Sequence, residues 1–392
     1  MLRRAWVDTK NLYYDPTFHG LDLDALYHRY DGALDHADSV GESLRLVASF
    51  LAEFHDSHLY LIPPDRGALY MADFNFRMIG DRCYITQVKP GSEAARKLHI
   101  GDKLVELNGF AIKRNNISDV RYYFRELAPR SFDDVTVRGI DGTLRSVQVD
   151  GEMLPRAYSS PNWRLHDEED ARRYRQRYID TGKIVIWKMP GFDFDPGTLD
   201  PILNAARKRS ALIIDLRGNP GGSVDSLEVL VGRLFDHTVK IAELVARKPQ
   251  KPMLSQRQIP PYLGPLYVLV DSASGSGAEL LARVVQIERR GIVLGDRTAG
   301  GVMEAETEDE QIGAPEYGLS YSFSITTADL VMSDGQRLEG KGVQPDQLLL
   351  PTAQDLAAGK DPVMAKATEL AGDPMTPEEA GRLFPFEWEK LF

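Results

Sequence analysis

The stretch VLVDSASGSGAE, residues 268–279, runs from an apolar segment through a glycine-flanked serine, Ser276, into a second apolar run. The residues before the turn predict a buried strand, and those from Gly277 to Arg289 predict a helix. Backbone N–H groups at a helix N-terminus lack partners, so they can stabilise the negative charge of a tetrahedral intermediate. Gly275 and Gly277 keep side chains away from that position. The alternative is a turn in which Ser276 only caps the helix.

A second glycine-rich loop occupies the same place after another apolar strand. Its sequence is LIIDLRGNPGG, residues 212–222, and it leads into a predicted helix at residues 223–235. The bare backbone amides of Gly221 and Gly222 can supply the other half of an oxyanion hole.

The segments around these loops alternate between strand and helix. Predicted strands cover residues 184–187, 211–216, 266–271 and 292–294, and predicted helices cover residues 223–235 and 277–289. The strands are short and mostly apolar, as expected when both faces of a sheet are buried. We therefore predict an α/β core over residues 153–392, with a helical tail after Pro362.

Residues 69–152 predict a small β-rich module. Its strand-like runs at 83–88, 135–137 and 146–149 are separated by turn dipeptides such as Asn108-Gly109. The stretches VKPGSEA (88–94) and LHIGDKLVELNG (98–109) resemble a PDZ domain. This resemblance implies peptide capture by strand addition to a sheet edge. The alternative is a purely structural β-domain.

Residues 1–68 predict a mainly helical cap. Ser39 and Glu42 form a candidate capping box, and apolar residues follow at helical spacing: Val40, Leu44, Val47, Leu51 and Phe54. This helix would deliver His55, Asp56, Ser57 and His58 at its C-terminal end.

The composition is that of an ordinary globular protein of two or three domains. The chain has 392 residues, of which 43% are hydrophobic and 27% charged. A net charge of −11 without a long basic run argues against nucleic-acid or anionic-lipid partners. The single cysteine, Cys83, excludes an internal disulfide framework.

The N-terminus reads MLRRAWVDTK, which predicts no signal peptide, and no apolar run is long enough to span a bilayer. We expect no membrane insertion. The compartment stays open: the chain would be cytoplasmic, or exported if it is a trimmed form.

The loops DLRGNPGG (215–222) and SGSGAE (274–279) together resemble the core of C-terminal processing peptidases and of tricorn protease, in the tail-specific and tricorn clan. The resemblance covers nearly the whole chain, as helical cap, PDZ module and crotonase-like catalytic core. It implies a serine peptidase with Ser276 as nucleophile and an oxyanion hole formed by Gly277 with Gly221 or Gly222. It also implies unfolded polypeptides or short peptides as substrates, an acyl-enzyme intermediate and no cofactor.

The chain departs from the processing peptidases at the base. Those enzymes carry a lysine in a Thr-Phe-Gly-Lys-Gly loop, whereas residues 295–302 here read GDRTAGGV, with Gly301 at the lysine position. A neutral serine is a poor nucleophile without a base, so another base is needed.

The tricorn branch supplies one by resemblance. There a histidine preceded by a serine ends the cap, and DSHLY (56–60) gives Ser57 and His58. LEGKGVQPD (338–346) matches the segment that carries a glutamate, here Glu339. The stretch 163–190, with RYID at 177–180, also resembles the entry into that core. The resemblance thus implies a Ser276/His58/Ser57/Glu339 tetrad, in which histidine accepts the serine proton.

Other sites find less support. His55 and His58 have no His-Glu-x-x-His pattern and no evident third ligand, so we expect no metal site. Gly335 to Lys341 mimics a phosphate loop, but Gly342 replaces the required Ser or Thr.

Two other classes of function stay open. The chain could be a catalytically silent ligand- or peptide-binding protein on the same fold, or a peptide-capturing scaffold that acts through the PDZ-like module. A homo-oligomer is compatible with either reading and with the peptidase.

Overall fold

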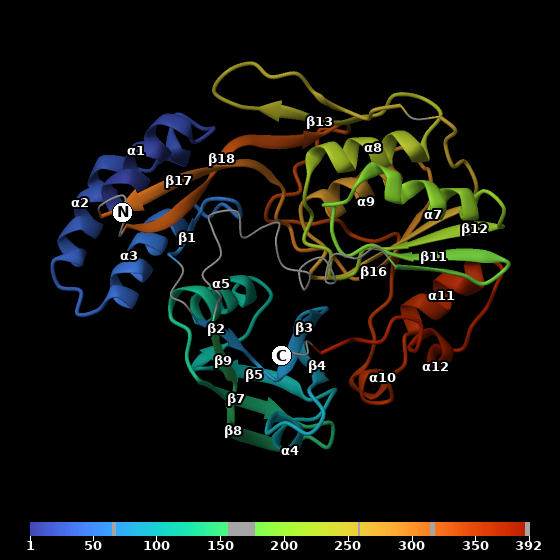
Figure 1. The fold of residues 1–392 in the computed structure, drawn as a ribbon, viewed down its shortest axis with the longest axis horizontal. Helices are drawn as coiled ribbons and strands as arrows, with labels where there is room; N and C mark the ends of the chain where they lie inside the picture. Colours follow the sequence, from blue (N-terminus) through green and yellow to red (C-terminus); the bar gives the residue numbers. More distant parts are fainter. Residues whose placement is uncertain (65–67, 156–176, 258, 314–317, 389–392) are drawn as a thin grey trace.

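The computed structural model describes residues 1–64, 68–155, 177–257, 259–313 and 318–388, and Figure 1 shows its fold. The structure is a mixed α/β fold, as predicted. Residues 156–176 lie outside the described residues. They include the start of the 163–190 stretch.

The central sheet has six strands in the order β10-β11-β12-β15-β16-β19. The strands are β10 Arg177–Asp180, β11 Ile184–Lys188, β12 Ala211–Asp215, β15 Leu266–Val270, β16 Ile292–Gly295 and β19 Gln347–Leu348. β10 is antiparallel to β11, and the others are parallel. The four predicted core strands are thereby confirmed.

Helices cover both faces of this sheet (Figure 1). One face packs on α7 Leu199–Ala206, α8 Val224–Leu234 and α9 Gly277–Ile287, and the other on α11 Pro362–Leu370 and α12 Pro377–Ala380. Along β11, Val185 and Trp187 belong to the first core, and Ile184 and Ile186 to the second. Burial on both faces explains why the strands are apolar throughout.

A second sheet of five strands was not predicted. It consists of β1 Tyr60–Ile62, β18 Leu319–Met332, β13 Lys240–Val245 and β14 Met253–Leu254 in that order, with β17 Met303–Ile312 paired to β18. β17 has the sequence MEAETEDEQI, and acidic residues are depleted in strands. Local propensity therefore conceals a strand that pairs with β18 along its whole length.

Three helices pack against this second sheet: α1 Leu2–Leu12, α2 Leu23–Leu34 and α3 Val40–Ala52. Their shared core includes Phe50 and Leu51 from α3 and Phe323 and Ile325 from β18. The cap helices thus lie beside the hairpin of β17 and β18 in Figure 1.

The start of α3 differs in detail from the prediction. Ser39 Oγ accepts the Glu42 N–H at 3.1 Å, but the Glu42 carboxylate accepts from Asp38 N–H instead of from Ser39. Only half of the capping box forms as expected. Val40 is 71% exposed, because it starts the helix before the face that reaches the core, and the other four predicted apolar positions are buried.

A third sheet lies between residues 74 and 150. Its strands are β3 Phe74–Ile79, β4 Arg82–Val88, β5 Lys103–Leu107, β7 Phe132–Arg138 and β8 Leu144–Asp150, with the short β6 Phe110–Ala111 beside β5. β2 Ala68–Met71 pairs separately with β9 Glu152–Pro155. Helices α4 Ala94–Lys97 and α5 Ile117–Tyr122 complete this part, and α10 Ala353–Ala357 follows the central sheet. The predicted runs at 83–88, 135–137 and 146–149 lie within β4, β7 and β8.

The division into domains at 1–68, 69–152 and 153–392 stays a prediction, as does the PDZ-like assignment.

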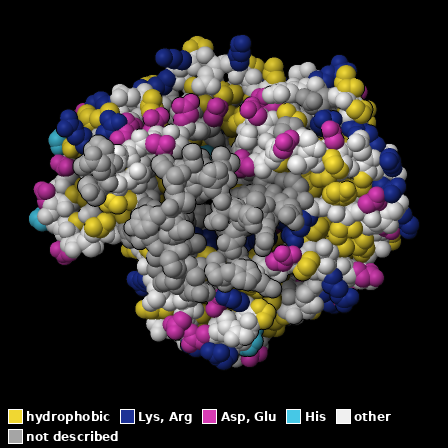
Figure 2. Space-filling view, viewed as in Figure 1, with side chains coloured by type: hydrophobic (Ala, Val, Ile, Leu, Met, Phe, Trp, Pro, Cys, Tyr) yellow, Lys and Arg dark blue, Asp and Glu magenta, His cyan; other side chains and the backbone are white. Residues whose placement is uncertain are grey.

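None of the helices in the described segments combines the length and apolar character needed to cross a membrane. On the face shown in Figure 2, basic and acidic side chains are interspersed rather than gathered into a basic patch.

Candidate active site

Ser276 occupies a sharp turn between β15 and α9. Its backbone angles are φ 48° and ψ −117°, outside the regions that serine ordinarily adopts. Its N–H donates to the Gly301 carbonyl at 2.9 Å and to Glu279 Oε2 at 3.1 Å, which helps to hold this conformation. Backbone strain of this kind gathers at functional sites, and a strained strand-to-helix turn can expose a serine hydroxyl.

The glycine loop after β12 packs directly against this turn. A β-carbon on Gly221 would lie 2.6 Å from Ser276 Cβ, so only glycine fits there. The Gly221 N–H already donates to Asn219 Oδ1 at 2.8 Å. Among the described residues, Gly222 and Gly277 keep N–H groups without a hydrogen-bond partner. The geometry therefore favours Gly222 over Gly221 as the donor that accompanies Gly277.

The predicted base lies just beyond the end of α3. Ser57 Oγ is 2.7 Å from His58 Nδ1 and 2.9 Å from Glu339 Oε2. The Ser57 N–H also donates to Glu339 Oε1 at 3.0 Å, so both carboxylate oxygens bind Ser57. The structure thus joins the adjacent residues Ser57 and His58 to Glu339, which lies 282 residues further along the chain.

This chain of hydrogen bonds assigns a tautomer to His58. The Ser57 hydroxyl carries one proton and donates it to Glu339, so its oxygen accepts from His58 Nδ1–H. Nε2 then carries the lone pair of the neutral ring. A lone pair at that nitrogen is what a general base requires.

Burial sets the charge states of this pair. It lowers the pKa of His58 from its ordinary value of 6.5, against the opposing effect of Asp56. It also raises the pKa of Glu339, although hydrogen bonds from Val302 and Ser57 oppose that rise. A lowered histidine pKa keeps the ring neutral, and so able to accept a proton, at lower pH.

Asp56 anchors the segment that carries His58. Its Oδ1 accepts the His58 N–H at 2.9 Å and the Thr326 hydroxyl at 2.7 Å, and its Oδ2 accepts the Tyr13 hydroxyl at 3.0 Å. Tyr13 comes from the end of α1 and Thr326 from β18. Sequence reasoning assigned Asp56 no role, because these partners are distant in the chain.

The segment Gly300–Val302 lies between Ser276 and the His58–Ser57–Glu339 chain. Gly301 N–H donates to Glu279 at 3.0 Å, and the next N–H, of Val302, donates to Glu339 at 2.6 Å. A β-carbon on Gly301 would lie 3.4 Å from Ser57 Oγ. The position at which the resemblance places a dyad lysine therefore faces Ser57. Among the described residues no hydrogen bond joins the Ser276 hydroxyl to His58, and such bonds often tighten only when substrate binds.

Comparison with known families agrees with this geometry. Residues 180–349 match the model of peptidase family S41, and residues 1–52 match the tricorn protease C1 domain. The chain contains an S41 peptidase domain. The S41 match spans both glycine loops, Ser276 and Glu339, and the predicted resemblance to the tail-specific and tricorn peptidases is confirmed.

Individual relatives extend the similarity over most of the chain. A putative tricorn protease homolog 2 of Streptomyces coelicolor is 26% identical over 92% of this chain and 31% of its own length. A putative tricorn-like protease C-terminal subunit of Sulfurisphaera tokodaii is 22% identical over 95% of this chain and 43% of its own length. The chain spans less than half the length of these curated relatives.

Solved structures share the fold. Mature CPAF superposes with a TM-score of 0.66 at 16% identity, covering 91% of this chain and 94% of that one. The tricorn protease gives a TM-score of 0.52 at 18% identity, covering 95% of this chain and 36% of that one. At these identities the likeness between this chain and the solved structures is one of fold alone.

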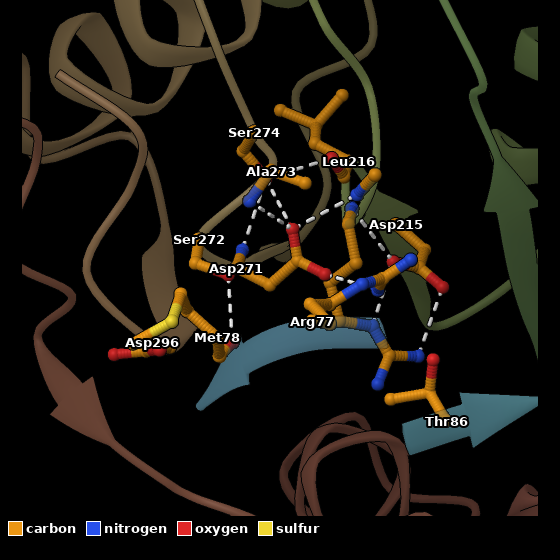
Figure 3. A network of polar contacts seen from close by, with 12 residues as sticks. Arg77, Met78, Thr86, Asp215, Leu216, Asp271, Ser272, Ala273, Ser274 and Asp296 are labelled. Atoms are coloured by element: carbon orange, nitrogen blue, oxygen red, sulfur yellow. Dashed lines mark hydrogen bonds and ion pairs between the residues drawn. The ribbon is translucent and has the colours of Figure 1, made fainter. Parts of the chain in front are cut away.

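The sheet of residues 74–150 contacts residues 271–274, which precede Ser276, as Figure 3 shows. Arg77 on β3 forms an ion pair with Asp271, which also accepts the N–H groups of Gly218 at 2.9 Å and Ala273 at 3.0 Å. The Ser272 hydroxyl donates to the Met78 carbonyl at 2.6 Å. One carboxylate, from Asp271, therefore ties both glycine loops to β3.

A second ion pair, from the turn between β6 and α5, reaches the other side of the site. Arg114 pairs with Asp296 at 2.6 Å, and Gly80 N–H donates to the same carboxylate at 2.9 Å. Asp296 begins the loop that leads to Gly301. Both loops that flank Ser276 thus have a partner among residues 74–150.

A cavity of about 800 Å³ opens beside Glu339. Its lining includes Tyr14, His19 and Asp56 from the cap and Met303, Arg337 and Lys341 from the core. Its volume lies in the range of ligand pockets.

Within the described segments, no group of three or more His, Cys, Asp and Glu side chains is placed to hold a metal ion.

Proposed function

We propose that this chain is a serine peptidase that cleaves peptide bonds through the tetrad Ser276, His58, Ser57 and Glu339. One observation carries the proposal: the strained Ser276 turn and the His58–Ser57–Glu339 chain meet at the same residue, Gly301. Neither a capping serine nor a surface histidine requires that arrangement.

In the proposed mechanism, Ser276 Oγ attacks the scissile carbonyl carbon while its proton passes to His58 Nε2. The C–O bond forms, and the carbonyl becomes an oxyanion that accepts from the N–H groups of Gly222 and Gly277. The C–N bond then breaks as His58 returns the proton to the leaving amine. Water, activated by His58 in the same way, releases the acyl group and regenerates Ser276.

Ser57 and Glu339 act on the ring rather than on the substrate. When His58 takes up a proton its charge is stabilised by the hydroxyl of Ser57, which Glu339 polarises. The same contacts keep Nδ1 bonded to Ser57, so that only Nε2 is available to accept the proton from Ser276.

Unfolded polypeptides or short peptides are the proposed substrates, and no cofactor enters the proposed mechanism. The relatives named above are proteases, and the chemistry requires only an extended chain that reaches Ser276. The β3–β8 sheet is proposed to capture peptides at an exposed strand edge. The net charge of −11 and the mixed surface of Figure 2 support partners other than nucleic acids. A homo-oligomer is compatible with the proposal.

A fluorophosphonate probe tests the nucleophile, followed by mass spectrometry of products from a peptide library. We expect the probe to label Ser276, label to be absent from Ser276→Ala, and acyl transfer to produce defined cleavage products. Tight peptide binding by titration without labelling or cleavage would instead identify a binding protein on the same fold.

A further inference from the structure

Glu279 is a buried carboxylate for which the proposed mechanism has no use. It is the third residue of α9 and is 0% exposed. Oε1 accepts from the Thr298 hydroxyl at 2.5 Å and Gly300 N–H at 2.8 Å, and Oε2 accepts from the N–H groups of Gly301 at 3.0 Å and Ser276 at 3.1 Å.

All four partners are donors, and none carries a charge. A buried carboxylate usually has a cation beside it, because the loss of hydration is costly. Among the described residues, no Lys, Arg or His side chain pairs with Glu279, and four hydrogen bonds stabilise its ionised form instead. An amide of the same shape cannot replace it, because its NH₂ group would face N–H donors.

The four donors belong to two different parts of the site. Ser276 is the nucleophile turn itself. Gly300 and Gly301 start the segment whose next residue, Val302, donates to Glu339 at 2.6 Å. A path of consecutive contacts therefore runs from the Ser276 amide through Glu279 and residues 300–302 to the Glu339 carboxylate.

A parallel path runs through Thr298. Its hydroxyl oxygen accepts the Val343 N–H at 2.6 Å, and its N–H donates to the Val343 carbonyl at 3.1 Å. Val343 follows Glu339 by four residues in the same turn. Glu279 thus fixes the nucleophile relative to both loops that place the base.

We propose that Glu279 is a positioning residue that holds the Ser276 turn in register with the Gly300–Val302 segment, so that nucleophile and base keep their reacting distance. The consequence for catalysis rests on the proposed peptidase function. The structural part of the proposal, that the Glu279 carboxylate couples two segments, is independent of that function.

Protonation should weaken this coupling. Burial raises the pKa of Glu279 to about 7, and only the hydroxyl and N–H donors named above oppose the rise. Among the residues that the structure describes, no charged side chain bonds to the Glu279 carboxylate, and Glu339 lies beyond Val302. In the protonated form a hydrogen would sit on an oxygen that faces N–H donors, so the bonds to Ser276 and to residues 300–301 would loosen together near neutral pH.

The test compares Glu279→Gln with Glu288→Gln, which changes an exposed glutamate at the C-terminal end of the same helix. We expect Glu279→Gln to lower kcat for a short peptide by about 100-fold with little change in KM, since a displacement of about 1 Å costs that much. It should also remove the ionisation near pH 7 from the pH profile of kcat. Glu288→Gln should do neither.

Amide hydrogen exchange, corrected for the intrinsic pH dependence, supplies a readout without turnover. In the wild type, protection of residues 276–279 and 298–302 should change together as pH passes through about 7, and in Glu279→Gln neither segment should show this change. Because this exchange measurement is made on the wild type, it stays informative even if the Glu279→Gln variant misfolds. If peptidase activity proved absent, the exchange would still decide the coupling.

Protection that is independent of pH in both segments would overturn the proposal, and so would a change in one segment alone. An unchanged pH profile of kcat in a folded Glu279→Gln variant would overturn its catalytic part.

Discussion

A methyl group at position 221 would lie 2.6 Å from Ser276 Cβ, so the two glycine loops meet with no space for a side chain. Gly221→Ala should therefore displace the Ser276 turn and reduce kcat/KM by about 100-fold or more. Steady-state cleavage of a short peptide measures this effect.

Gly335→Ala is the matched control for that variant. Gly335 has a similar left-handed φ of +81°, but a β-carbon there would meet nothing within 4 Å. It should lose a little stability and keep its kcat/KM. Equal loss of activity in both variants would mean that backbone strain, and not contact with Ser276, decides the outcome.

Ser276→Ala should leave the fold intact and lower turnover by about 10⁶-fold, because nucleophile and base act as a unit. Ser272→Ala removes only a hydrogen bond to the Met78 carbonyl and should stay active. Full peptidase activity in Ser276→Ala would place the nucleophile elsewhere.

Ser274→Ala is a poor control for Ser276→Ala, although Ser272 and Ser274 look alike in the sequence. Ser274 is fully buried, accepts the Asp271 N–H at 2.9 Å and donates to the Leu216 carbonyl at 2.8 Å. Its loss should destabilise the fold by about 1–3 kcal/mol, which thermal unfolding measures.

The tetrad predicts an order of effects. His58→Ala should cost about as much kcat as Ser276→Ala, because it removes the proton acceptor. Glu339→Gln and Ser57→Ala should cost less, because they orient the ring without holding the proton in transit. Single-turnover cleavage of an activated ester and of a peptide would measure each step.

Lys341→Ala is the control for this series. Lys341 is exposed and lies two residues from Glu339. We expect its loss to be mild. Near-normal cleavage by His58→Ala together with inactive Lys341→Ala would exclude the histidine base and indicate a relocated Ser/Lys dyad.

The pH dependence of stability follows from Glu279. Its pKa is about 7 in the folded state and 4.5 when exposed, so its contribution to stability is complete below pH 4.5 and is lost as pH rises through about 7. The free energy of unfolding of the wild type, relative to Glu279→Gln, should therefore fall by about 3 kcal/mol between pH 4 and pH 8. Thermal midpoints of both proteins across this range measure it, and a constant difference would contradict the assignment.

Arg77→Ala should impair short and long substrates equally. It removes the ion-pair partner of the buried Asp271 carboxylate, and Asp271 holds both glycine loops. A loss of cleavage activity confined to long substrates would instead indicate that β3 acts only in peptide capture. Arg138→Ala, an exposed change on β7 of the same sheet, controls for general damage.

The sequence alone predicted the elements whose signals are local. The apolar strands of the central sheet, the helix starts after each glycine loop and the Ser39 cap depend on neighbours within a few residues. It also singled out Ser276, because a glycine-flanked serine between strand and helix is a local pattern. The roles of His58, Ser57 and Glu339 came from resemblance, and they stay predictions.

Only the tertiary structure decided how these parts meet. β17 is a strand because β18 pairs with it, although its acidic residues disfavour one. Among the described residues Gly222, and not Gly221, keeps an N–H without a partner, because Asn219 Oδ1 accepts the N–H of Gly221. Glu279 and Asp56 acquire partners more than a few residues away, which no local pattern reveals. The physical reason is that hydrogen bonds between distant segments form only after three sheets have packed and placed their loops side by side.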